Sequence, residues 1–156
     1  MIGPAENTLA TMTEALRVAV KSLPVEVLYG RQRLEQSVIT TNRIEVNQVG
    51  PSRLGPSMGA RMSDDPSVGA RTISAQVVID AHDDRAGAAQ EDHERIANFF
   101  ADVVWAFFLE EGQGRGETID QWAGTGGLAD VPQGDLSTGA RYVLNFSIGR
   151  SVKRLS

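Results

Sequence analysis

The chain has 156 residues, of which 41% are hydrophobic and 22% charged, and its 15 Lys and Arg against 20 Asp and Glu give a formal net charge of −5. This composition is typical of one globular domain and excludes a disordered chain. The acidic balance, with Lys21 and Lys153 as the only lysines, argues against a dedicated nucleic-acid-binding domain, which needs clustered basic residues. Because the chain has no cysteine, disulfides, thiol nucleophiles and Cys-ligated zinc or iron–sulfur clusters are excluded.

The sequence contains no segment that we expect to export the chain or to enter a membrane. Its first twenty residues include Glu6, Glu14 and Arg17 and lack the continuous apolar core of an export signal. The most apolar stretch, residues 99–109, contains Asp102 and is about half as long as the ~20 residues that span a bilayer. We therefore expect an intracellular, soluble protein without a membrane partner.

The N-terminal part of the chain predicts a helix, two strands and a long loop. Apolar side chains recur at three- and four-residue steps over residues 5–23, which is typical of an amphipathic helix that Pro24 ends. Residues 25–29 and 38–46 are β-prone, and we expect them to form neighbouring strands. Residues 47–70 are rich in Gly, Pro, Ser and Arg and predict a loop, and loops of this length in a small domain are usually functional or disordered.

The C-terminal part predicts a strand, a long helix, a second loop and a last strand. Apolar and polar side chains alternate over residues 71–81 and again over residues 140–152, as in half-buried strands. After a polar bridge at residues 82–89, apolar side chains recur at helical spacing as far as Phe108. Trp105 and Leu109 widen this apolar surface, so either the core or a second subunit must cover it. The Gly-rich residues 112–139 predict the second long loop.

These elements predict an α+β fold in a single domain over residues 1–156. The economical arrangement is a two-layer sandwich, in which two helices cover one face of a mostly antiparallel four-stranded sheet. The two long loops, residues 47–70 and 112–139, connect elements of this sandwich.

A G-x-S-x-G pattern, Gly55-Pro56-Ser57-Met58-Gly59, raises the alternative of a small hydrolase with Ser57 as its nucleophile. The motif acts on a turn between a strand and a helix, and the sequence predicts neither a strand before Ser57 nor a helix after it. The chain is also short for an α/β-hydrolase, and Pro56 removes a backbone donor beside the serine. A flexible loop is the favoured interpretation, and we assign no catalytic residue.

Two histidines, His82 and His93, raise the alternative of a metal or acid–base site, together with the nearby carboxylates of Asp80, Asp83, Asp84, Glu91 and Asp92. Zinc ligands on one helix lie one turn apart, whereas these histidines are eleven residues apart across a loop. The carboxylates suit the N-terminus of the helix that follows. The glycines after that helix form no phosphate-binding motif, because no Gly-Lys-Ser or Gly-Lys-Thr occurs. We therefore expect no metal and no cofactor.

The residues best suited to contacts between subunits lie mainly in or beside the two predicted loops. Arginine pairs bidentately with carboxylates and tryptophan is enriched at interfaces, so an acidic chain with loop arginines could bind copies of itself. Core packing is an equal alternative for Trp105, whereas Trp122 is flanked by Gln121 and by nearby glycines. The candidate interface residues are Arg53, Arg61, Asp64, Asp65, Arg71, Trp105, Arg115 and Trp122.

The order of the predicted elements resembles that of the tail terminator and tail-completion proteins of tailed bacteriophages. The resemblance begins with the amphipathic helix, the two strands and the long loop. It continues with the strand that ends Val77-Val78-Ile79-Asp80-Ala81, the aromatic helix, and the last strand, Tyr142-Val143-Leu144-Asn145-Phe146-Ser147-Ile148. It covers nearly the whole chain as element order and length, and the family has no short signature motif.

The resemblance implies a small structural, non-enzymatic subunit that forms a ring, commonly of six copies, at the head-proximal end of the tail tube. Such a ring ends tube polymerisation and joins the tail tube protein to the head-closure or connector protein. It implies a location in the virion neck, after assembly in the host cytoplasm. Six copies at −5 carry a formal −30, so we expect DNA to pass through the lumen without specific binding. Another neck or head-closure connector protein would leave much the same sequence pattern.

Overall fold

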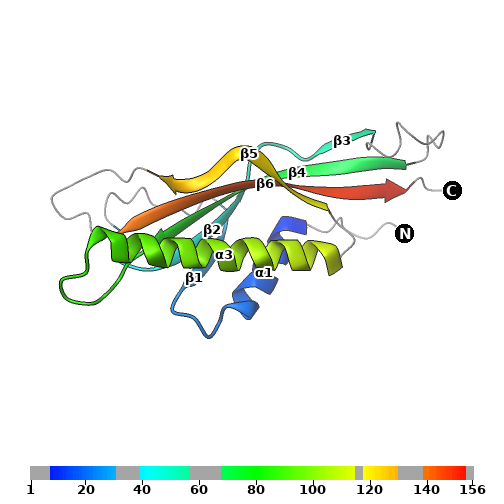
Figure 1. The fold of residues 1–156 in the computed structure, drawn as a ribbon. Coiled ribbons are helices and arrows are strands. Elements are labelled where there is room, and N and C mark those ends of the chain that lie inside the picture. Colours follow the sequence, from blue (N-terminus) through cyan, green and yellow to red (C-terminus); the bar gives the residue numbers. More distant parts are fainter. Residues whose placement is uncertain (1–7, 31–38, 57–67, 115–117, 130–138, 154–156) are drawn as a thin grey trace.

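A computed structural model describes residues 8–30, 39–56, 68–114, 118–129 and 139–153 of the chain. In these residues six strands form one sheet, and two helices form a second layer against it (Figure 1). The elements in chain order are α1 (Thr8–Ala19), β1 (Glu26–Tyr29), β2 (Arg43–Gln48), β3 (Arg53–Pro56), β4 (Val68–Ala81), α3 (Gln90–Gly114), β5 (Thr118–Ala129) and β6 (Ala140–Lys153).

The centre of the sheet is a long antiparallel ribbon of β4 and β6. The two strands pair over their full length, from Val68 opposite Lys153 at one end to Ala81 opposite Ala140 at the other. On the other edge of β4, β2 pairs with residues 75–80 and β3 with residues 69–72, both antiparallel. The strand order is β1-β2-β4-β6-β5, with β1 parallel to β2.

Both helices lie on one face of this sheet, where the alternating strands present their apolar side chains (Figure 1). On β4 the side chains of Ile73, Val77 and Ile79 are buried, because every second residue of a strand faces the same side. α3 adds Phe108, whose ring centroid lies 4.8 Å from that of Phe146 on β6. The core is therefore built between the ribbon and the two helices.

The opposite face of the sheet carries a ladder of alternating charges. The register places Arg43 between Glu26 and Asp80, and Asp80 opposite Arg141. The Asp80 carboxylate accepts hydrogen bonds from Arg141 at 2.7 Å and 3.4 Å, and Arg43 Nε lies 3.9 Å from Glu26 Oε2. These cross-strand pairs stabilise the register of the four strands.

The structure confirms the α+β class and the two helices on one sheet face, but the four-stranded antiparallel sheet is wrong. Each segment predicted as a long loop contains a strand, β3 within residues 47–70 and β5 within residues 112–139. Gly55 and Pro56 in β3 and the glycines in β5 lower the intrinsic β-propensity of these strands, and pairing with β4 and β6 outweighs it. A register shift between Gln121 and Gly126 shows that β5 pairs irregularly. β1 and β2 are neighbours as predicted, although they run parallel.

The predicted start of α3 is confirmed, but α3 continues to Gly114, into the segment 112–139 that was predicted as a loop. The polar bridge at residues 82–89 ends where α3 begins, at Gln90. α1 ends at Ala19, four residues before the predicted end, because residues 20–23 form a turn in which the Leu23 amide donates to the Val20 carbonyl. In the part of the chain that the structure describes, neither helix is long and apolar enough to cross a membrane.

Candidate functional site

The turn between β4 and α3 forms a shallow pocket of about 170 Å³. Gly87 makes the turn possible, because its φ of 76° lies in the left-handed region that other residues rarely adopt. The lining residues are His82, Asp83, Asp84, Arg85, Gly87, Ala88 and His93. The structure thus brings together both histidines that the sequence singled out.

The two histidine rings are stacked, with centroids 5.2 Å apart and an interplanar angle of 12°. His93 is buried, and its Nδ1 accepts a hydrogen bond of 2.8 Å from the Asp83 amide. An acceptor at Nδ1 means that neutral His93 carries its proton on Nε2. Burial, and next the charge of a protonated His82, lower the pKa of His93.

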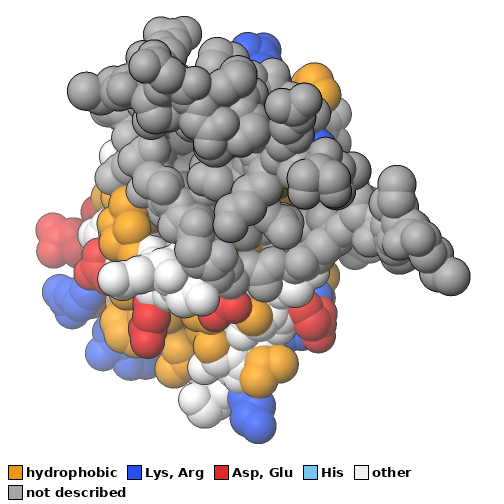
Figure 2. Space-filling model, turned by 90° about the vertical axis from the view of Figure 1, so that its right-hand side faces the viewer, with side chains coloured by type: hydrophobic (Ala, Val, Ile, Leu, Met, Phe, Trp, Pro, Cys, Tyr) orange, Lys and Arg blue, Asp and Glu red, His pale blue; other side chains and the backbone are white. Residues whose placement is uncertain are grey.

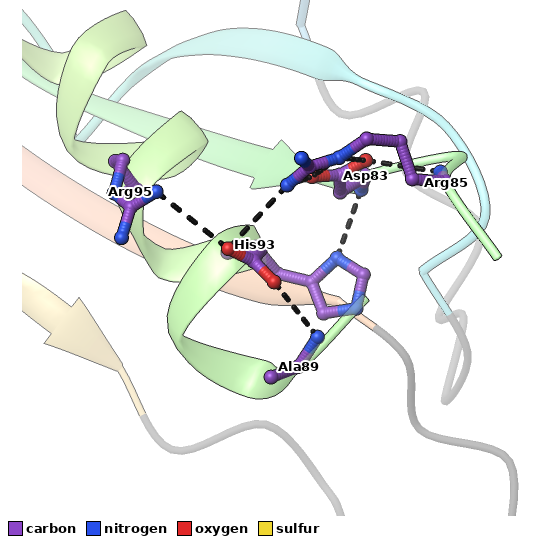
Figure 3. Close-up of polar contacts among 6 residues, drawn as sticks. Asp83, Arg85, Ala89, His93 and Arg95 are labelled. Atoms are coloured by element: carbon purple, nitrogen blue, oxygen red, sulfur yellow. Dashed lines mark hydrogen bonds and ion pairs between the residues drawn. The ribbon is translucent and has the colours of Figure 1, made fainter. Parts of the chain in front are cut away.

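A network of charged side chains joins this turn to the first turn of α3 (Figure 3). Arg85 binds both carboxylate oxygens of Asp83 and lies 3.4 Å from Asp92 Oδ1. The side-chain hydrogen bonds from Arg85, and next its backbone amide, lower the pKa of Asp83 to about 2. Asp92 Oδ2 accepts a 2.9 Å hydrogen bond from the Ala89 amide, so Asp92 caps α3 as its sequence position suggests.

These contacts hold the turn between β4 and α3 in place. In the described residues no group of three or more His, Asp or Glu side chains is arranged so that it could hold a metal ion. The Nδ1 of His93 already accepts a backbone proton, and the pocket lining contains no hydroxyl nucleophile. The geometry instead fastens the end of β4 to the start of α3, where Gln90 also donates to the Gly139 carbonyl at 3.0 Å.

Ser57, the nucleophile of the alternative hydrolase hypothesis, lies outside the described residues. One argument against that hypothesis is wrong, because β3 ends at Pro56 and therefore a strand does precede Ser57. The loss of the Pro56 amide as a donor still argues against a nucleophile elbow.

The candidate interface residues fall in three places. Arg53 is exposed on β3, and Arg71 on β4 donates a 2.7 Å hydrogen bond to Ser52 Oγ. Trp105 is half-buried on α3 and packs edge-on against Phe146, with centroids 6.1 Å apart. Trp122 belongs to β5 instead of a loop, and its side chain lies outside the described part. Outside the described residues altogether are Arg61, Asp64, Asp65 and Arg115.

The outer face of α3 exposes bulky apolar side chains, among them Leu109, which widens the apolar surface of the helix as the sequence predicted. Phe99 is 51% exposed and Leu109 is 40% exposed, and Ala106 between them is also exposed. We call these three residues the outer face of α3. Figure 2 shows, from the end of the molecule on the right in Figure 1, that hydrophobic side chains of the described surface lie among acidic and basic ones.

The strand register places two basic residues of β6, which sequence reasoning did not name as interface candidates, opposite residues of β4. Arg150 lies directly opposite Arg71, and Lys153 lies opposite Val68. Both residues belong to the predicted last strand or follow it directly, but only the register shows that Arg150 pairs with Arg71.

The chain matches no protein-family model and no curated protein.

Proposed function

We propose that this chain is a structural protein of a tailed-bacteriophage virion, and that six copies form a ring at the head-proximal end of the tail tube. The ring would end tube polymerisation and join the tube to the head connector. The resemblance in element order supports this proposal, and so does the α+β fold with two helices on one sheet face. The observation that carries the self-association is the outer face of α3.

The outer face of α3 is available for a neighbour because the inner side of the helix already fills the core. Phe100, Val104 and Phe108 are buried against the sheet, whereas Phe99 and Leu109 remain 51% and 40% exposed. Single exposed apolar side chains are ordinary on a protein surface. Two bulky ones and an alanine within eleven residues of one helix, with the exposed Asp102 among them, suit a subunit contact of mixed apolar and polar character.

The sheet supplies the rigidity that a ring subunit needs. The β4–β6 ribbon pairs over fourteen residues on each strand, and its polar face is cross-linked by the Asp80–Arg141 pair at 2.7 Å. Each copy would add a formal charge of −5 to the ring. An acidic lumen repels DNA and would let it pass without specific binding.

A head-closure or other neck connector is the second candidate. The same outer face of α3 supports it, because a subunit contact does not distinguish one ring of the neck from another. The location of the protein in the virion decides between the two.

Antibody-labelled negative-stain electron microscopy of a lysate that contains the native protein tests the proposal. We expect label at one end of free tails and at the junction of heads and tails. Label confined to the junction or to tail-less heads would favour the connector, and label on no particle would contradict both candidates.

A pair of variants tests the part played by α3. Phe99→Asp places a charge on the outer face of α3 and should abolish ring particles of the purified chain. Val18→Asp is the matched control, because Val18 is 60% exposed on α1 and lies outside that face. If both variants lose ring particles equally, or if neither loses them, the outer face of α3 no longer supports the proposed self-association.

A further inference from the structure

The stacked histidines lie where β4 ends and α3 begins, so a movement of either ring acts on the junction of the two elements. His93 is 3% exposed, and the side chain of His82 is 19% exposed. The ring planes lie within 12° of each other, with centroids 5.2 Å apart. Both rings line the shallow pocket of about 170 Å³, so protons from solvent can reach them. Histidine changes its charge near neutral pH, which makes this pair a candidate for a response to pH.

The hydrogen bond between the Asp83 amide and His93 requires a neutral His93 ring. The Nδ1 of His93 accepts this bond at 2.8 Å (Figure 3). A neutral imidazole has one nitrogen that can accept, whereas a protonated imidazole donates from both nitrogens. In a protonated His93 the Nδ1–H group would therefore face the N–H group of Asp83. Two donors cannot share this contact, so the ring or the turn has to move when His93 takes up a proton.

The stacking of the two rings also depends on charge. Two protonated imidazoles at this separation repel each other, and the repulsion is stronger in a partly buried site than in water. The pKa of His93 is lowered by burial and next by the charge of a protonated His82. A proton on His93 is therefore unfavourable for the hydrogen bond and for the stack at the same time.

Several other titratable groups belong to the elements that meet at the stack. In the described part of the chain they are Asp83, Asp84 and Arg85 of the turn, Glu91, Asp92, Glu94 and Arg95 of α3, and Tyr142 of β6. The charges of Asp83 and Asp92 favour a protonated His93, but burial and His82 outweigh them. His82 has a carboxylate of its own nearby, because its Nε2 lies 3.5 Å from Asp84 Oδ1.

The other contacts of the turn do not depend on a histidine side chain. Arg85 binds both carboxylate oxygens of Asp83 and lies 3.4 Å from Asp92 Oδ1. The pKa of Asp83 is lowered to about 2, chiefly by the side-chain hydrogen bonds from Arg85, so this pair stays charged at any pH near neutrality. The strands β4 and β6 contain no histidine. We therefore expect the response to a proton to be confined to the turn.

We propose that the His82–His93 stack is a pH-sensitive latch on the turn between β4 and α3. Neutral His93 keeps the latch closed by holding the Asp83 amide, and a proton on the His93 ring opens it. In the open state residues 83–88 leave the ring, while Arg85 keeps them near α3 and the β4–β6 ribbon keeps its pairing. The latch belongs to the single chain, so it goes beyond the proposed ring and does not depend on it.

The direction of the response follows from the lowered pKa of His93 in the closed latch. In the open latch the ring meets water and returns to the ordinary histidine pKa of ~6.5. The open state therefore binds the proton more tightly, and opening becomes more favourable as the pH falls below ~6.5. For one proton, the opening equilibrium should shift by up to about tenfold between pH ~7.5 and pH ~5.5.

Amide hydrogen exchange of the full chain, followed by NMR, tests the latch. The protection factor of the Asp83 amide, which corrects for the intrinsic pH dependence of exchange, should fall by up to about tenfold from pH ~7.5 to pH ~5.5. At each pH it should stay well below the protection factors of the β4–β6 ribbon, since the turn opens without unfolding. A pH-independent Asp83 protection factor, or one equal to that of the ribbon throughout, would overturn the latch.

The nitrogen resonances of the histidine rings give a second readout that needs no variant. At high pH His93 should show an unprotonated Nδ1 and a protonated Nε2, and at low pH both nitrogens should be protonated. The midpoint should lie below pH ~6.5, and the Asp83 amide resonance should move with the same midpoint. A protonated His93 ring with an unchanged Asp83 amide resonance would contradict the proposal.

Two matched substitutions distinguish His93 from its stacking partner. His93→Gln supplies an oxygen that accepts the Asp83 amide and does not titrate, so the Asp83 protection factor should no longer depend on pH. His82→Gln removes the charge that lowers the pKa of His93, so the response should persist with its midpoint at higher pH. A response that persists in His93→Gln would refute the latch, and so would one that His82→Gln alone abolishes. If His93→Gln does not fold, the ring titration of the native chain decides.

Discussion

Replacing Phe108 by alanine should destabilise the domain far more than the same change at Phe99, although both residues belong to α3. Phe108 is fully buried and its ring lies 4.8 Å from that of Phe146, whereas Phe99 is 51% exposed. A buried Phe→Ala change costs about 3–5 kcal/mol through lost burial and the cavity that remains. Phe99 keeps about half its surface in water, so Phe99→Ala should cost about 1 kcal/mol, or half of the ~1.5–3 kcal/mol for complete burial.

Urea unfolding followed by tryptophan fluorescence measures both values. Trp105 reports on the core because it packs edge-on against Phe146, with centroids 6.1 Å apart. At ~2–4 °C per kcal/mol for a domain of this size, Phe108→Ala should lower the melting temperature by about 6–20 °C. Phe99→Ala should instead weaken self-association while the chain stays folded. Equal losses of stability in the two variants would show that the outer side of α3 is packed within the monomer.

Further predictions concern the junction of β4, β6 and α3. A Cβ on Gly139 would lie 2.5 Å from Ile39 Cβ, so Gly139→Ala should lower stability by about 1–3 kcal/mol, and an unchanged urea midpoint would contradict this. The pKa of His93 is lowered in the folded chain, so unfolding takes up a proton when the pH is below the ordinary histidine pKa of ~6.5. The free energy of unfolding should therefore decrease as the pH is lowered below ~6.5, and His93→Gln should make this decrease smaller. Urea titrations across this pH range measure the effect, and an equal pH dependence of stability in the native chain and in the His93→Gln variant would contradict the role of His93. Asp80→Ala removes the partly buried carboxylate that pairs with Arg141, and it should lower the free energy of unfolding by about 1–3 kcal/mol. The double variant with Arg141→Ala should cost less than the sum of the single variants in thermal melts, and strict additivity would exclude the coupling.

The helices and the two long strands could be predicted because a single local pattern determines each of them. Residues 71–81 alternate apolar and polar side chains, and the structure buries one set against the helices. β3 and β5 were missed because Gly and Pro lower local strand propensity, and their strand state depends on pairing with β4 and β6. The thirteen residues between β1 and β2, residues 30–42, are enough for the crossover connection that a parallel pair requires, but their length alone does not predict the parallel pairing.

The candidate interface could be predicted only as far as residue type allowed. Loop arginines indicated that the acidic chain could bind carboxylates, and Arg53 and Arg71 do lie in adjacent strands. The position of Arg150 opposite Arg71 depends on a register between residues 79 apart in the chain, which no local pattern reveals. The same holds for the stacking of His82 on His93, because the turn that folds one onto the other is fixed by Gly87 and the contacts of Arg85.

Native mass spectrometry of the full chain tests the central claim, that copies of this protein close into a ring. The account predicts one dominant species near 101 kDa, six times the 16.8 kDa of the chain. The Phe99→Asp variant should instead be found mainly as the monomer. A single species of the native chain at 16.8 kDa over all accessible concentrations would contradict the account, and so would a continuous ladder of sizes without a closed form.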